Sequence, residues 1–268
     1  MKQQIKDFFF DEGIEYYSAL SYSDVKEINS SLAERSGINM RSVIIFLIPY
    51  YTDEAENISV YSSSKDYHLI IKDITDRLIK LLSQLYPDHN FRGFGDHSPI
   101  NEIDAALAAG LGIVGDNGLI INEKYGSYVF AADVITDIPP EELGAEKRRD
   151  ICHCIGCGDC AESCPTGILR AECDKCLSAI TQTKGELNDD DIELMRRYGT
   201  VWGCDICQSV CPYNKEPKKT PIPFFFEERI SRLSTDIIEG MSDEEFKKRA
   251  FAWRGRKIVL RNLKYLDM

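Results

Sequence analysis

The sequence predicts a mixed α+β protein in which an N-terminal α/β domain precedes a cysteine-rich domain and a short helical C-terminal segment. The expected boundaries are 1–146, 147–215 and 216–268. Two observations predict this organisation. All ten cysteines lie between Cys152 and Cys211, whereas the earlier residues carry alternating strand and helix patterns. A Pro-Pro pair at 139–140 and the charged residues that follow it separate the two kinds of sequence, as a linker does.

The first elements of the N-terminal part are expected to be long. Residues 1–36 have apolar side chains at helical spacing and are expected to be helical. Residues 42–48 form a continuous apolar, β-branched run that ends before Pro49, which predicts a buried strand. Apolar residues at steps of three and four after Lys65 predict an amphipathic helix, which Pro87 ends.

Shorter elements are expected before the linker. Residues 91–94 predict a short strand, and 102–109 predict a small helix that closes at Gly110. Residues 119–121 and 127–135 are expected to pair as two strands around a turn.

The segment from Gly110 to Gly118 matches the G-x-G-x-x-G pattern of dinucleotide-binding proteins. It follows a predicted helix rather than a strand, which excludes that interpretation. We therefore expect these glycines to permit a close approach to the backbone.

Charge and hydropathy argue against a general nucleic-acid-binding protein and against a membrane protein. The net charge of −12 and the pI of about 4.9 argue against broad electrostatic binding of nucleic acid. Residues 240–268 differ, because eight basic residues oppose four acidic ones there. No apolar run approaches the length of a membrane span, and Asp7 and Asp11 follow the N-terminus too closely for a signal peptide. We expect a cytoplasmic protein without a membrane partner.

The cysteines form one complete and one broken iron–sulfur motif. The first run, from Cys154 to Pro165, reads C-x2-C-x2-C-x3-C-P, the bacterial ferredoxin pattern. The second consists of Cys176 and then C-x2-C-x3-C-P from Cys204 to Pro212. Disulfides would require an oxidising compartment, and zinc would favour paired C-x2-C motifs without the C-x3-C-P ending. Two [4Fe–4S] clusters are therefore expected.

The spacing also predicts the ligands, because the fourth cysteine of such a run ligates the other cluster. Cluster one is assigned to Cys154, Cys157, Cys160 and Cys211. Cluster two is assigned to Cys204, Cys207, Cys176 and Cys164. Cys152 and Cys173 are left over, and Cys173 is an alternative to Cys176 because both precede the second run at similar distances.

Two further helices are expected around the second cysteine run. Residues 189–198 lie between its cysteines and predict a helix. A last helical segment is introduced by Ser242-x-x-Glu245, which is a capping box.

Motifs outside the cysteines resemble the epoxyqueuosine reductase family, from about residue 42 to the C-terminus. The matching segments are Lys65-Asp-Tyr-His68, Asp96-x-x-Pro99, Ala109-Gly-Leu-Gly-x-x-Gly115, Gly126-Ser127, Thr136-Asp137, Cys176-x-Ser178, Gly203-Cys-Asp-x-Cys-Gln-x-x-Cys-Pro-x-Asn214 and Arg261-Asn262. Three departures are that Asp116 replaces a common Lys, Asp133 replaces a Glu, and the chain stops near the point where helical repeats begin.

The resemblance implies a cobalamin-dependent iron–sulfur enzyme that removes the epoxide oxygen of epoxyqueuosine in tRNA. It implies two [4Fe–4S] clusters, cobalamin, and an external electron donor such as a flavodoxin or ferredoxin. It also implies that Asp96 donates a proton to the departing oxygen, for which we expect a buried carboxyl group. From the residues alone, a turn-capping role beside Ser98 and Pro99 is the preferred interpretation of Asp96.

The same resemblance implies which residues bind the cofactor. The expected contacts are Asp96, Gly110, Gly112, Gly115, Ile120, Ala131, Ser178, Tyr61, Tyr67 and His68. Two alternatives stay open. One is a shortened relative that reduces a substrate other than tRNA, and the other is a two-cluster electron-transfer protein without cobalamin.

Overall fold

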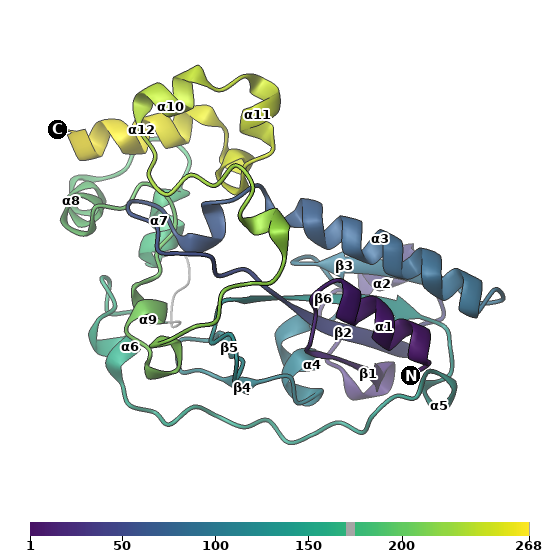
Figure 1. The fold of residues 1–268 in the computed structure, drawn as a ribbon. Coiled ribbons are helices and arrows are strands. Elements are labelled where there is room, and N and C mark those ends of the chain that lie inside the picture. The colour runs from purple at the N-terminus through teal and green to yellow at the C-terminus, as the bar shows by residue number, and fades with distance from the viewer. Residues whose placement is uncertain (170–174, 268) are drawn as a thin grey trace. The chain divides into compact units, whose positions relative to one another are not determined.

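The computed structural model describes residues 1–169 and 175–267, which form two compact units (Figure 1). Unit 1 contains Met1–Tyr50, His68–Gly115 and Leu119–Cys154. Unit 2 contains Tyr51–Tyr67, Asp116–Gly118 and the chain from Ile155 onward. Each unit is therefore discontinuous in sequence. The sequence-based boundaries near 146 and 215 stay predictions.

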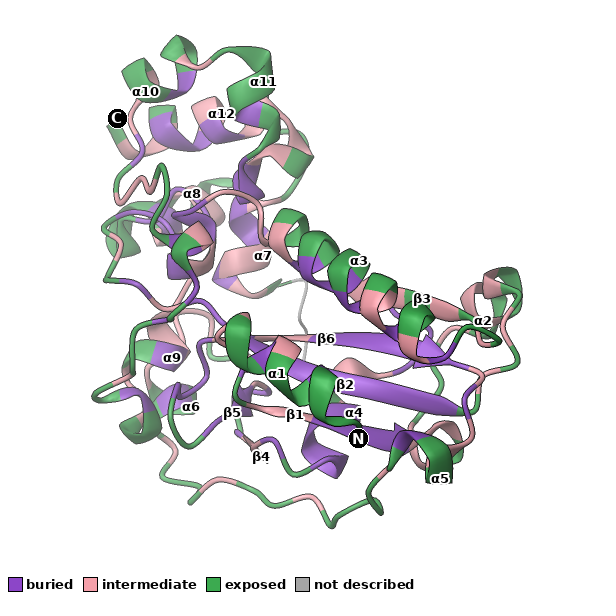
Figure 2. Ribbon diagram, turned by 45° about the vertical axis from the view of Figure 1, so that its right-hand side comes forward, coloured by how far each residue is buried: buried purple, intermediate pink, exposed green. Residues whose placement is uncertain are grey.

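Unit 1 is built on a four-stranded antiparallel sheet with the strand order β1-β2-β6-β3. Its strands are β1 (Tyr17–Ser21), β2 (Ser42–Pro49), β6 (Val129–Thr136) and β3 (Phe91–Gly95). Strands β2 and β6 lie in the centre and are largely buried (Figure 2). Their continuous apolar sequences are explained by this, since both faces of a central strand are covered. The strands expected at 42–48 and 91–94 are confirmed.

Helices cover both faces of this sheet. On one face lie α1 (Gln3–Asp11) and the long α3 (Tyr67–Leu85), and on the other lies α4 (Glu102–Ala108) (Figure 1). A Cβ atom on Gly93 would lie 2.6 Å from Thr75 Cβ, and one on Gly95 would lie 2.5 Å from Ile71 Cγ2. Glycines in β3 therefore allow α3 to pack close to the sheet. The amphipathic helix and the small helix expected from the sequence are both confirmed.

The prediction that residues 1–36 are all helical was wrong. They contain α1, then β1, a 3-10 turn (Tyr22–Asp24) and α2 (Ser30–Ser36). Strand β1 pairs with β2 along its whole length, and Ser18, Ala19 and Leu20 are buried there. Pairing with an edge of the sheet outweighs the local helical spacing, because strand preference depends on what the side chains pack against.

The expected pairing of 119–121 with 127–135 was also wrong. Strand β5 (Ile120–Ile121) pairs instead with β4 (Ile113–Val114), while β6 joins the main sheet. Only a single bridge, between Asn122 and Gly126, remains at the turn. The apolar β6 buries far more surface between β2 and β3 than it could against the two-residue β5. Pairing in the main sheet is therefore more stable than a hairpin with β5.

Unit 2 is mainly helical. Its helices are α6 (Asp159–Glu162), α7 (Leu177–Thr181), α8 (Asp189–Tyr198), α9 (Ile206–Ser209), α10 (Thr235–Gly240), α11 (Asp243–Lys247) and α12 (Arg256–Asp267). Short 3-10 helices span Val60–Ser62, Pro212–Asn214, Pro223–Phe225 and Ala250–Arg254. A core around the fully buried Trp202 includes Val259 and Leu263 of α12. The expected helix α8 and the capping box of Ser242 and Glu245 at the start of α11 are confirmed.

The predicted linker begins with a single helical turn in unit 1, α5 (Pro140–Leu143), which places a proline at its first position. Among the helices of the described residues, none combines the length and the apolar character that crossing a membrane requires.

Candidate functional site

Asp96 lies in a tight turn directly after β3. Its φ of 66° is left-handed, which among the described residues it shares with only one other non-glycine residue, Glu228. The Asp96 side chain is 62% exposed, so the expectation of a buried carboxyl group was wrong. The strand has already ended at Gly95, and the turn directs the side chain away from the core. His68 in the first turn of α3 approaches it, with 3.6 Å between Nε2 and Asp96 Oδ2.

The backbone of the Asp96 turn is held by Glu102, the first residue of α4. The N–H of Asp96 donates to Glu102 Oε1 at 3.0 Å. Asn101 caps the same helix by accepting the N–H of Asp104 at 3.0 Å. Asn101, rather than Asp96, therefore caps this helix. The turn that contains Asp96 is itself bound by a neighbouring carboxyl group, and the turn-capping interpretation of the Asp96 side chain stays open.

A second carboxyl group, Asp133 on β6, is fully buried beneath this turn region. Both of its oxygens are buried, and the Ser98 hydroxyl is close enough to act on the carboxyl group as a hydrogen-bond donor. Burial raises the pKa of Asp133 to about 7, and the nearby Ser98 hydroxyl lowers it only in part. Burial also raises the pKa of Glu102 to about 8, and the charges of Asp133 and Asp96 raise it further. Sequence reasoning gave no role to Glu102 and mentioned Asp133 only as a departure, although a carboxyl group in an apolar strand is itself a signal.

The glycine segment packs against its own unit. A Cβ atom on Gly112 would lie 2.6 Å from the carbonyl oxygen of Ile121 and 2.9 Å from Ile120 Cγ2. Gly110 has a left-handed φ of 73°, with the Arg149 side chain above it. The N–H of Gly115 donates to the carbonyl of Leu119 at 3.0 Å. The close approach that these glycines permit is therefore made by strand β5 and its neighbours.

Two of the expected cofactor contacts share one core in unit 1. Ile120 is buried in the cluster between α4 and the sheet, and Ala131 packs against that cluster. In unit 2 the rings of Tyr61 and Tyr67 meet edge to face, with their centroids 6.2 Å apart. The indole N–H of Trp202 donates to the Tyr61 hydroxyl at 3.1 Å.

The predicted ligands of cluster two lie near one another in unit 2. Burial raises the pKa of Cys204 to about 11, and Cys176 and Cys164 are close enough to raise it further. Burial also raises the pKa of Cys207 to about 12, with added contributions from Cys204 and Cys176. A metal bound at these thiols would supply the positive charge that favours their thiolate form.

Cluster one has its predicted ligands in two parts of the chain. Cys157, Cys160 and Cys211 belong to unit 2, whereas Cys154 is the last residue of unit 1. Burial raises the pKa of Cys160, with Asp116 and Cys157 adding to it. Cys152 is exposed, and Cys173 lies outside the described residues. Within those residues, no three or more His, Cys, Asp or Glu side chains gather tightly enough for a single metal ion.

A cavity of about 450 Å³ in unit 2 borders the second cysteine run. Its lining includes Cys176, Cys204, Cys207, Ser178, Trp253 and Arg254. Ser178, expected to contact cobalamin, thus shares a cavity with all four predicted ligands of cluster two, since Cys164 also lines it. The Arg254 guanidinium lies over the Trp253 ring, 3.7 Å from its centroid.

Asp205 supports the cysteine loop from within the motif. It accepts the backbone N–H of Val60 at 2.6 Å, the side-chain amide of Gln208 at 3.1 Å and the Ser59 hydroxyl. Gly203 is left-handed with a φ of 76°, and a Cβ atom there would lie 2.5 Å from Ser59 Cβ. The motif residues that are not cysteines therefore fix the loop against the segment at 59–60. These residues are part of the family motif, but the motif alone did not indicate that they hold the loop in place.

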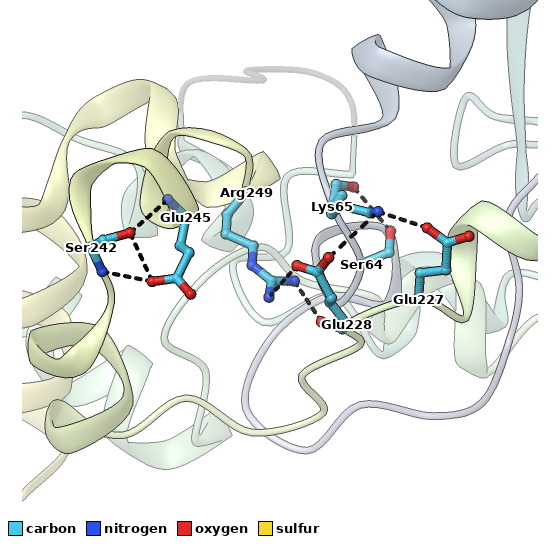
Figure 3. Close-up of polar contacts among 7 residues, drawn as sticks. All are labelled: Ser64, Lys65, Glu227, Glu228, Ser242, Glu245 and Arg249. Carbon is cyan, nitrogen blue, oxygen red and sulfur yellow. Dashed lines mark hydrogen bonds and ion pairs between the residues drawn. The ribbon is translucent and has the colours of Figure 1, made fainter.

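Lys65, the first residue of the Lys65-Asp-Tyr-His68 motif, forms ion pairs with two glutamates in unit 2 (Figure 3). Its ammonium group lies 2.7 Å from Glu227 Oε2 and 3.7 Å from Glu228 Oε1, and its side chain is 15% exposed. Arg249 is buried and donates to the Glu228 carbonyl at 2.6 Å. This network joins the segment before α3 to the segments around Glu228 and Arg249, within unit 2.

Two family models match the chain. The 4Fe-4S double cluster binding domain matches residues 153–214, and Epoxyqueuosine reductase QueG, DUF1730 matches residues 34–97. An epoxyqueuosine reductase from Cyclobacterium marinum is 33% identical over 220 residues, which cover 78% of this chain and 69% of that protein. The chain belongs to the epoxyqueuosine reductase family. The resemblance inferred from the motifs is therefore confirmed, and the first model supports the iron–sulfur prediction.

Other epoxyqueuosine reductases show how much of the family's length is present. The chain is 31% identical to the Lactococcus garvieae protein and 33% identical to the Bacillus cereus protein, and the matches cover 76% and 75% of this chain. The matched regions span 59% and 54% of those two relatives. The solved Streptococcus thermophilus epoxyqueuosine reductase covers 99% of this chain with a TM-score of 0.79 at 23% identity, and 80% of its own chain is matched. The predicted mixed α+β fold is confirmed by this likeness.

Proposed function

We propose that this member of the epoxyqueuosine reductase family is a cobalamin-dependent iron–sulfur reductase that removes the epoxide oxygen of epoxyqueuosine in tRNA. The observation that carries the proposal is the cavity of unit 2, because Cys176, Cys204 and Cys207 border it together with Ser178. All four predicted ligands of cluster two line this apolar cavity, which therefore suits the cluster itself, and Ser178 at its wall stands where a second cofactor would receive electrons from that cluster. A solved family member, 24% identical to this chain, was crystallised with an epoxyqueuosine-modified tRNA stem loop, which supports the substrate.

The residues present fit both groups. The eight predicted cysteine ligands would hold two [4Fe–4S] clusters, and Ser178 would contact cobalamin at the cavity wall. When bound, the clusters supply single electrons and reduced cobalamin supplies the two-electron reductant. The remaining contacts, Gly110, Gly112, Gly115, Ile120, Ala131, Tyr61, Tyr67 and His68, are proposed on the family resemblance.

The chain's own residues supply the proton chemistry. Converting an epoxide into an alkene and water consumes two electrons and two protons. Asp96 donates one proton to the departing oxygen, the second proton comes from water, and His68 Nε2, 3.6 Å from Asp96 Oδ2, stabilises the carboxylate that results. A solved Bacillus subtilis family member shows an aspartate-containing catalytic loop swung out of the active site, which supports an exposed, movable Asp96 turn in this chain.

The tRNA contact is proposed in the basic segment 240–268. Lys257 is exposed, and Arg254 lies beside the cavity. Arg256 is less available for phosphate, because it donates to the Ile238 and Ser242 carbonyls and pairs with Asp243. This engagement, with the net charge of −12, favours a second candidate: a family member that reduces an epoxide outside tRNA.

Anaerobic reconstitution with iron, sulfide and cobalamin tests the proposal. About eight irons and one cobalamin per chain are expected, with conversion of an epoxyqueuosine-modified stem loop measured by mass spectrometry of the released nucleoside. A protein that holds both clusters but no cobalamin is an electron carrier instead. One that holds all three groups and leaves the stem loop unchanged supports the second candidate.

A further inference from the structure

The carboxyl groups of Glu102 and Asp133 lie close enough for their charges to interact, near the Asp96 turn that Glu102 binds. In the sheet, Asp133 lies opposite Ile45 of β2 and Phe94 of β3. Both neighbours belong to the core that packs against α4, and Glu102 is the first residue of that helix. The Asp133 side chain is thus on the face of the sheet where α4 begins.

An ionised Asp133 is strongly disfavoured where it lies. Its side chain is completely buried, and the Ser98 hydroxyl offsets only part of the resulting cost of ionisation. A buried carboxyl group keeps its proton or shares one with a neighbouring acid unless its charge is compensated. Glu102 is the acid close enough to interact with it electrostatically.

Other titratable groups face the pair from three elements. Asp96 approaches Glu102 from the turn after β3, and His68 approaches from α3. Tyr22 approaches Asp133 from the 3-10 turn after β1, where its hydroxyl donates to Glu27 at 2.7 Å. His68 is the one side chain among these that can add positive charge.

Glu102 is tied directly to the proposed proton donor. Its Oε1 accepts the N–H of Asp96, whose left-handed backbone is unusual for a residue other than glycine. Such a conformation persists where the surrounding structure holds it. The carboxyl group of Glu102 supplies one such contact.

We propose that Glu102 is the positioning residue of Asp96, and that Glu102 and Asp133 share one proton that keeps the pair compact enough to hold the Asp96 turn. The inference rests on the proposed function, because it gives Asp96 the role of proton donor. Loss of the shared proton leaves two carboxylates side by side, and their repulsion moves Glu102 and the turn that it binds.

Three variants of the reconstituted enzyme separate the parts of this proposal. Glu102→Ala removes the acceptor of the Asp96 N–H, and kcat is expected to fall by about 10- to 100-fold with little change in KM, while iron content stays normal. Glu102→Gln restores an acceptor without a titratable proton, so it recovers most of that loss below pH 7. Asp133→Asn removes the repulsion from the other side. Glu34→Gln, an exposed site on α2, is the matched control.

The pH profile and an infrared titration give readouts that a merely structural role would not change. Wild type is expected to lose turnover above about pH 8, in parallel with loss of a protonated-carboxyl C=O band. Glu102→Gln and Asp133→Asn each leave one protonated carboxyl group, so the band should weaken and titrate at lower pH than in wild type, and the alkaline limb should shift. The Glu34→Gln control should keep both.

Two results overturn the proposal. One is a wild-type carboxyl band that is absent throughout pH 6–9, and the other is Glu102→Ala with the wild-type kcat and pH profile. Failure of the proposed function looks different. In that case Asp96→Asn retains full turnover, or the stem loop is not converted by any variant, while the infrared band of the Glu102 and Asp133 pair still titrates and still moves to lower pH in the two substitutions.

Discussion

Asp205 accepts the backbone N–H of Val60 at 2.6 Å, although the two residues are 145 positions apart in sequence. Because Asp205 stands between Cys204 and Cys207, this bond fixes the loop that carries two predicted ligands. Asp205→Ala should leave buried donors without partners and lower the free energy of unfolding by about 1–3 kcal/mol. The iron content after reconstitution should fall towards one cluster per chain. Normal iron content in Asp205→Ala would show that the loop holds its shape without this bond.

The ligand assignment is tested by iron content. Cys157→Ser removes a predicted ligand of cluster one and should lower iron from about eight to about four per chain. Cys152→Ser changes an exposed cysteine outside the assignment and is the matched control. Iron and sulfide analysis after anaerobic reconstitution measures both. Equal loss in the two variants would contradict the assignment.

The role of Asp96 is tested by removing its proton while keeping its shape. Asp96→Asn should bind both clusters and cobalamin normally, with turnover reduced by roughly 10²- to 10⁴-fold, the usual contribution of a positioned general acid. Single-turnover assays with stoichiometric reductant measure the chemical step. A wild-type rate in this variant would remove the assignment of Asp96 as proton donor.

The buried Asp133 makes stability depend on pH. Its pKa rises from 3.8 to about 7 on folding because burial disfavours the charged form. Between these values the unfolded chain releases a proton that the folded chain keeps. The stabilising contribution is therefore complete below about pH 4 and is lost as the pH rises through 7, at about 1.4 kcal/mol per pH unit.

Asp133→Asn removes this dependence. Relative to wild type, its apparent unfolding temperature should rise between pH 5 and pH 8, and Glu34→Gln should follow wild type. Thermal unfolding at four pH values across this range is the measurement. Parallel curves for wild type and Asp133→Asn would mean that Asp133 ionises freely in the folded protein.

Gly112 is predicted to tolerate no side chain, because Ile121 backbone atoms occupy the place of a Cβ atom. Gly112→Ala should separate β4 from β5 and destabilise unit 1 by about 1–3 kcal/mol. Gly240→Ala is the control, since a Cβ atom there meets nothing within 4 Å. Chemical denaturation of both variants measures the difference. Equal stability would show that β5 can move aside.

Long, strongly patterned segments were predictable from the sequence. The buried strand β2 and helix α3 follow from runs of apolar residues that admit one interpretation each. Strand β1 was missed because its five residues gain their stability from pairing with β2 rather than from their own pattern. The same holds for β5, whose partner is set by how β6 is buried.

The candidate site shows the same division. The cluster ligands could be recognised from the spacing of the cysteines, because a cluster bound by one loop needs thiolates at fixed intervals. Glu102 has no such signature, since its importance comes from a hydrogen bond to a turn six residues earlier and from a strand 31 residues later. The exposure of Asp96 was equally invisible, because it depends on where β3 ends.

Strand β6 has a consequence for the order of events during synthesis. Both β2 and β3 hydrogen-bond to it, so the main sheet closes only when residues 129–136 have left the ribosome. The segment Tyr51–Tyr67 belongs to unit 2, and its Ile58 pairs with Trp202 in a β-bridge. This segment therefore cannot reach its folded contacts until a residue about 140 positions later has been synthesised. During that interval the cysteines of the first run emerge before those of the second. Both clusters are therefore expected to be complete only after Trp202 has been synthesised and packed in unit 2.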